Sequence, residues 1–131
     1  MEFAQSELYE YANNLCQSAG EPEGYIDNFW NVVSNNPELL KEFDYYARTN
    51  DFLCEYNVSG LTIADILVWQ IDRFKAALDE GKFSLKFNGP HMVLAAFLTM
   101  NDVAKNPAPY LSRFRSETGC DYPGKTYLRD L

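Results

Sequence analysis

Apolar side chains recur along most of this chain at intervals of three and four residues, the spacing of an α-helix with one buried face. In residues 3–17, for example, Leu8, Ala12 and Cys16 share a face and acidic side chains lie opposite. Gly, Pro and Asn interrupt the period at intervals, as they do at helix ends. The pattern predicts six helices: 3–17, 25–34, 37 to near 50, about 63–79, 91–105, and one that begins at Asn106-Pro107 and ends before 118.

The helix predicted over residues 63–79 is the most apolar of the six, and for two turns it is apolar on nearly every side. Such a helix is expected to be buried. Thr62 and Asp65 have the spacing of a capping box, in which the hydroxyl and the carboxylate each accept a backbone N–H. Leu61 and Ile66 have the spacing of a hydrophobic staple. We therefore expect Thr62 and Asp65 to act as a structural cap.

These elements predict an all-α fold, a single compact bundle of five to six helices around the buried central helix. Residues 82–88 alternate apolar and polar side chains as a strand does. A lone strand cannot satisfy its backbone hydrogen bonds, so we expect an extended connection there. The last residues, 118–131, show no period and are also expected to be extended. The whole chain, 1–131, is thus predicted to be one helical domain.

The net charge of −8 is distributed unevenly along the chain. Residues 1–65 contain twelve acidic side chains and two bases, Lys41 and Arg48, whereas residues 66–131 contain seven acids and nine bases. An acidic chain without a basic stripe is not expected to bind nucleic acid or an anionic membrane. The acidity has two alternative explanations. It is either solvated surface charge or an acidic patch that binds a basic partner.

Three widely spaced cysteines, an acidic start and no long apolar run favour a cytoplasmic protein. The only histidine, His91, has no cluster of Cys, Asp or Glu at ligand spacing, so no metal is expected. Paired acids such as Glu38 and Glu42 are interpreted as solvated charge on the exposed face of a helix. No catalytic motif is found, and the sequence therefore predicts neither an enzyme nor a cofactor.

Aromatic residues make up 15% of the chain, more than the helical core alone needs. Filling of the core explains most of them, and an aromatic-lined pocket or a protein interface are the alternatives. A pocket would lie near Trp30 and Trp69, with Asp72 as a polar lining residue. Asp72 can also form a structural ion pair. These three residues are the candidate ligand-binding residues.

The middle of the chain resembles the helical C-terminal domain of glutathione transferases over residues of about 37–115. That family enters its buried helix through a phrase matched here by Phe52-Leu53 and then Gly60-Leu61-Thr62-Ile63-Ala64-Asp65-Ile66. The resemblance implies a helical fold and a capping role for Thr62 and Asp65. It implies no glutathione site, because residues 1–36 are predicted as helices and nothing resembles the thioredoxin-like domain.

These observations favour a non-catalytic helical domain that acts through a protein partner or as a homodimer. The first alternative is a small-molecule-binding domain with the aromatic pocket described above. The second is an enzyme of an unrecognised type, since active sites are assembled in space rather than in sequence.

Overall fold

The structure is a computed structural model that describes residues 4–79 and 89–118. In these residues the chain forms six helices, which confirms the predicted all-α fold. The helices are α1 (Gln5–Ala19), α2 (Tyr25–Ser34), α3 (Pro37–Thr49), α4 (Ile63–Asp79), α5 (Gly89–Lys105) and α6 (Pro107–Thr118).

Local sequence signals account for several helix ends. Gly20 ends α1 in the left-handed region at φ 72°, where glycine has no steric penalty. The Asn36 side chain begins α3 by accepting the backbone N–H groups of Glu38 and Leu39 at 3.2 and 3.3 Å. Pro37 follows at the first helical position, where a missing N–H costs nothing.

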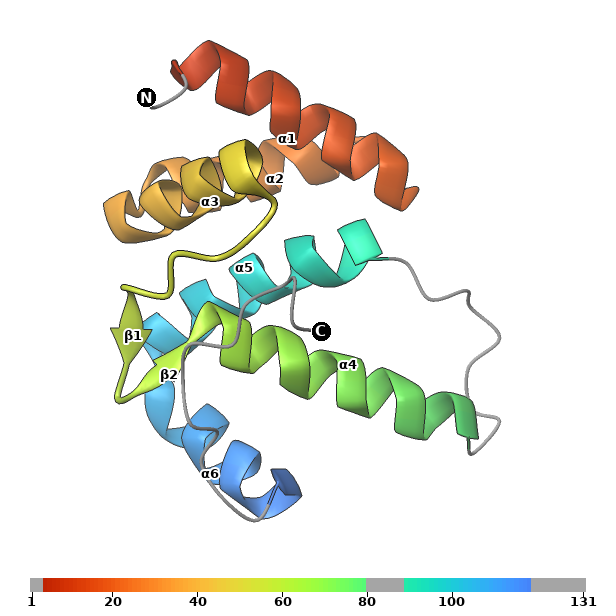
Figure 1. Cartoon of the computed structure of the whole chain (residues 1–131), viewed down its shortest axis with the longest axis vertical. Helices are drawn as coiled ribbons and strands as arrows, with labels where there is room; N and C mark the ends of the chain where they lie inside the picture. The colour runs from red at the N-terminus through yellow and green to blue at the C-terminus, as the bar shows by residue number, and fades with distance from the viewer. Residues whose placement is uncertain (1–3, 80–88, 119–131) are drawn as a thin grey trace.

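Helix α5 packs against each of the five other helices of the described chain. In Figure 1, α1 forms the top of the molecule and α6 the bottom, with α5 and α4 between them. The first half of α4 is buried on nearly every side, from Ile63 to Leu67 without interruption, as its composition predicts. Asp72 and Arg73 are exposed, so the second half begins to leave the core.

A two-stranded hairpin leads directly into α4. Strand β1 (Asn57–Val58) pairs antiparallel with β2 (Leu61–Thr62). Ser59 and Gly60 at the tip have φ values of 53° and 88°, the positive angles that a tight hairpin turn requires. Strands of two residues are too short to show alternation in the sequence, and the hydrophobic pattern predicts neither of them.

Aromatic rings form the centre of the core in the described part of the chain. Phe29, Phe43 and Phe97 come from three different helices and meet edge to face, with ring centroids 5.2 to 6.2 Å apart. Tyr46 and Phe52 stack on each other and contact Phe97. Edge-to-face pairs are the favoured geometry of aromatic rings and add to the free energy of burial.

The predicted connection at 82–88 and all but the first residue of the predicted tail at 118–131 lie outside the described residues. Thr118 itself is the last residue of α6. Within the described residues, none of the helices is long and apolar enough to cross a membrane.

Candidate functional site

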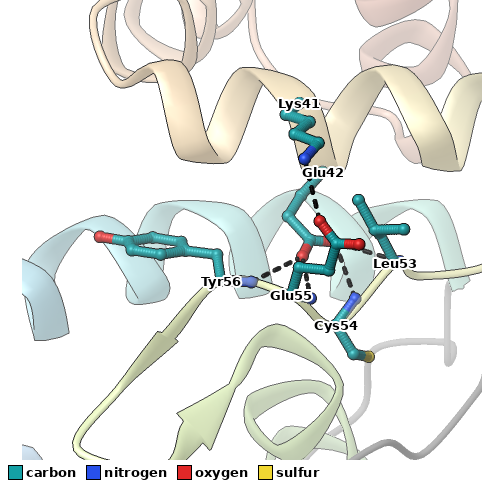
Figure 2. Close-up of polar contacts among 6 residues, drawn as sticks. All are labelled: Lys41, Glu42, Leu53, Cys54, Glu55 and Tyr56. Carbon is teal, nitrogen blue, oxygen red and sulfur yellow. Dashed lines mark hydrogen bonds and ion pairs between the residues drawn. The ribbon is translucent and has the colours of Figure 1, made fainter.

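A buried carboxylate on α3 holds the segment that follows this helix. Glu42 is 1% exposed, and its side chain points from α3 into the segment before β1 (Figure 2). Its Oε2 accepts the backbone N–H groups of Leu53 and Cys54 at 3.1 and 3.2 Å. Its Oε1 accepts those of Glu55 and Tyr56 at 3.0 and 3.2 Å. Four charge-assisted hydrogen bonds thereby compensate the burial of the charge.

The interpretation of Glu42 as solvated charge is therefore wrong. Its position already carried a signal, because it lies three residues after Leu39 and four before Tyr46, both of which are buried. An acid on an apolar helix face needs partners inside the protein. Next to it, the exposed Lys41 ammonium lies 2.9 Å from the Glu55 carboxylate, an ion pair over the same segment.

Thr62 and Asp65 exchange the hydrogen bonds of a capping box at the start of α4. Asp65 Oδ2 accepts the Thr62 backbone N–H and the Thr62 hydroxyl, both at 2.9 Å. The Thr62 hydroxyl oxygen accepts the Asp65 N–H at 3.3 Å. Burial raises the pKa of the Asp65 carboxyl, and the two bonds from Thr62 oppose that rise. The staple residues Leu61 and Ile66 are both buried.

Trp69 lies at the centre of an aromatic and ionic cluster between α4 and α6. Its ring packs edge to face on Phe114, and its Nε1–H donates to Glu117 Oε2 at 2.6 Å. The guanidinium groups of Arg73 and Arg113 lie 5.2 and 5.9 Å from the ring centroid. Both also pair with the Glu117 carboxylate, at 3.5 and 3.2 Å. Every member of this cluster thus has a partner within the chain.

A second surface cluster joins α1 and α2. Tyr9 is 36% exposed and is the one exposed large hydrophobic side chain within residues 4–73, 79 and 89–117. Its ring meets the half-buried Trp30 edge to face, with centroids 5.5 Å apart and planes at 88°. Its hydroxyl donates to Asp27 Oδ1 at 3.4 Å. We call Tyr9, Asp27 and Trp30 the α1–α2 aromatic face.

The three residues proposed from sequence to line a pocket occupy different surroundings. Trp30 belongs to the α1–α2 aromatic face, Trp69 is buried against Phe114, and Asp72 is exposed on α4. The aromatic contacts of the two tryptophans share no residue. The pocket they were expected to form stays a prediction. Trp30 was proposed from the sequence as a binding residue, whereas its exposed neighbours Tyr9 and Asp27 are identified only by the packing of α1 on α2.

The two cysteines of the described chain, Cys16 and Cys54, are buried and free. Burial and the nearby Glu42 and Asp65 carboxylates raise the pKa of the Cys54 thiol to about 11. Burial and Glu21 do the same for Cys16. Both thiols are therefore protonated at neutral pH, whereas a nucleophile needs the thiolate. His91 pairs with Glu21, which joins the first turn of α5 to the connection between α1 and α2.

The described residues contain no group of three or more His, Cys, Asp or Glu side chains able to hold a metal ion. Comparisons with protein families, curated proteins and solved structures found no match. The resemblance to the helical domain of glutathione transferases therefore stays a prediction that depends on the phrase around Thr62 and Asp65.

Proposed function

We propose that this chain is a non-catalytic helical domain that acts by binding another protein through the α1–α2 aromatic face. The observation that carries the proposal is the exposure of Tyr9 beside Trp30, since the other aromatic clusters among the described side chains lie in the core or are covered by arginines. Tyr and Trp are enriched in the energetically important centres of protein interfaces, because each combines a large apolar ring with a polar hydrogen.

Site-specific photo-crosslinking tests this proposal. A benzoylphenylalanine at Ser6, which is exposed and lies three residues before Tyr9, would capture a protein bound to the face. The matched control places the same group at Ser112, an exposed serine on α6 at the other end of the molecule. We expect a discrete adduct from position 6 that Tyr9→Ser abolishes, and none from position 112. Adducts that form equally at both positions, or that survive Tyr9→Ser, would contradict the proposal.

The same face would serve self-association if the partner is a second copy of the chain. Sedimentation equilibrium at micromolar concentrations separates the two cases. A single species near 15.1 kDa at every concentration excludes self-association and leaves a different protein as the proposed partner. A dimer that Tyr9→Ser dissociates identifies the second copy. A dimer that is unaffected by Tyr9→Ser would use another surface.

A further inference from the structure

Two aromatic clusters of this chain contain the same kinds of group, a ring and a carboxylate, but only one of them also contains a cation. In the Trp69 cluster a carboxylate, Glu117, accepts the polar hydrogen of the aromatic ring, and two guanidinium groups lie over that ring. In the α1–α2 aromatic face a carboxylate, Asp27, likewise accepts the polar hydrogen of an aromatic ring, here that of Tyr9. No cation lies over Tyr9 or Trp30 within the described residues.

The segment that forms α1 and α2 has no Lys or Arg to supply that cation. Residues 1–40 contain no Lys or Arg, whereas the described part of this segment contains six acids: Glu7, Glu10, Glu21, Glu23, Asp27 and Glu38. On α3, by contrast, an arginine does lie over an aromatic ring. The Arg48 guanidinium carbon is 5.8 Å from the centroid of the Tyr45 ring. The α1–α2 aromatic face therefore combines π faces and negative potential with no counter-ion from the residues of α1 and α2, which is the chemistry that attracts a guanidinium.

We propose that the α1–α2 aromatic face binds an arginine-bearing basic segment of a partner protein, with the guanidinium stacked on the Tyr9–Trp30 pair and paired with Asp27. This inference rests on the proposed function and adds the chemistry of the partner. A second copy is the less favourable occupant, because two chains that each carry a net charge of −8 repel one another.

A titration followed by NMR tests the inference. The probe is the blocked pentapeptide Gly-Arg-Gly-Arg-Gly, and the matched control replaces both arginines with citrulline, a neutral analogue of the same shape. We expect the arginine peptide to shift the Trp30 indole resonance and the amides around Tyr9 and Asp27 saturably, and the citrulline peptide to shift neither. Added salt should weaken the binding, because the site is exposed.

Variants locate the site. Tyr9→Ser and Asp27→Asn should each weaken binding of the arginine peptide by about two- to fivefold, the scale of one exposed cation–π contact. Tyr9→Phe, which keeps the ring, should retain most of the affinity. Asp102→Asn removes an equal charge from an exposed position on α5 and should have no effect. Circular dichroism establishes that each variant is folded.

Three results would overturn the inference. If the citrulline peptide produced the same NMR shifts as the arginine peptide, the face would have no preference for a cation. Shifts spread evenly over acidic residues on α3 and α5 would indicate unspecific charge attraction. Shifts on dilution of the protein alone would make a second copy the occupant. If no peptide binds, the cationic partner is excluded, and the photo-crosslinking at Ser6 decides separately whether the face binds protein at all.

Discussion

Glu42 and Asp65 are both 1% exposed carboxylates that accept backbone N–H groups, yet they are held in different ways. Glu42 receives four N–H groups from a segment 11 to 14 residues further along, shared evenly between its two oxygens. Within the described residues the Asp65 side chain bonds to Thr62 alone, three residues away, and through Oδ2. Its Oδ1 is buried without a hydrogen-bond partner among the described residues.

The difference separates an anchor from a cap. Glu42 joins α3 to the chain that leads to the hairpin, so its bonds fix tertiary structure. Asp65 closes one turn of helix, so its bonds fix only the start of α4. Because an unpaired buried oxygen has lost its water without replacement, the burial of the Asp65 carboxyl is compensated less completely by hydrogen bonds than that of Glu42.

The largest effect is expected from Glu42→Gln, which keeps the shape of the side chain. The amide would turn an NH₂ group toward two of the four N–H donors, leaving them unsatisfied in a buried site. We expect a loss of about 3 kcal/mol in the free energy of unfolding, since bonds to charged groups are the strong ones. Urea denaturation measures it. Glu38→Gln, exposed one turn earlier on α3, is the matched control and should change stability by less than about 0.5 kcal/mol. Equal midpoints for the two variants would show that Glu42 is no anchor.

A smaller effect is expected from Thr62→Ala. The change removes the hydroxyl that accepts the Asp65 N–H and donates to Oδ2. The usual cost of a lost N-cap is about 0.5–2 kcal/mol. Thr62→Ser keeps the hydroxyl and should recover most of the loss in the same denaturation experiment. If serine is as destabilising as alanine, the buried methyl group rather than the cap carries the energy.

Asp65→Asn should cost less still, below about 1 kcal/mol, because the amide oxygen can accept the Thr62 N–H while the buried charge is removed. Asp65→Asn is to be compared with Glu42→Gln, since both variants exchange a buried carboxylate for an amide of the same shape. The comparison predicts a clear gap between the two unfolding free energies. If Asp65→Asn destabilised the chain as much as Glu42→Gln, the distinction between cap and anchor would fail.

The contrast between the Asp65 cap and the Glu42 anchor also explains which features could be predicted from the sequence. The cap at Thr62 and Asp65 and the start of α3 at Asn36 and Pro37 were predictable, because their partners lie within three residues. The anchor at Glu42 was missed, because its partners lie more than ten residues away and no periodicity contains them. The α1–α2 aromatic face shares this limit: Trp30 could be proposed from composition, whereas the exposure of Tyr9 depends on how α1 packs on α2.

The smallest and most specific effect is the pH dependence of the cap compared with that of Glu117. Burial raises the folded-state pKa of Asp65 above its ordinary value of 3.8, so the folded state binds the proton more tightly than the unfolded state does. Its contribution to stability is therefore complete below that ordinary value and is lost as the pH rises through the folded-state pKa. The stability of the wild type relative to Asp65→Asn should fall as the pH rises from about 3.8 toward neutrality.

Glu117 should show the opposite sign. Partial desolvation acts to raise its pKa, but the hydrogen bonds from Trp69 and Arg113 and the nearby arginines outweigh it, and the pKa is lowered from 4.5. Its contribution is therefore present above pH 4.5 and is lost as the pH falls through the folded-state pKa. The stability of the wild type relative to Glu117→Gln should rise with pH over this window, by less than about 1 kcal/mol because the carboxylate is about one-third exposed. Urea denaturation of both variants between pH 3 and 7 measures the two slopes. Slopes of the same sign would mean that the Asp65 carboxylate is stabilised by its surroundings as the Glu117 carboxylate is, and the unpartnered Oδ1 would then have no energetic consequence.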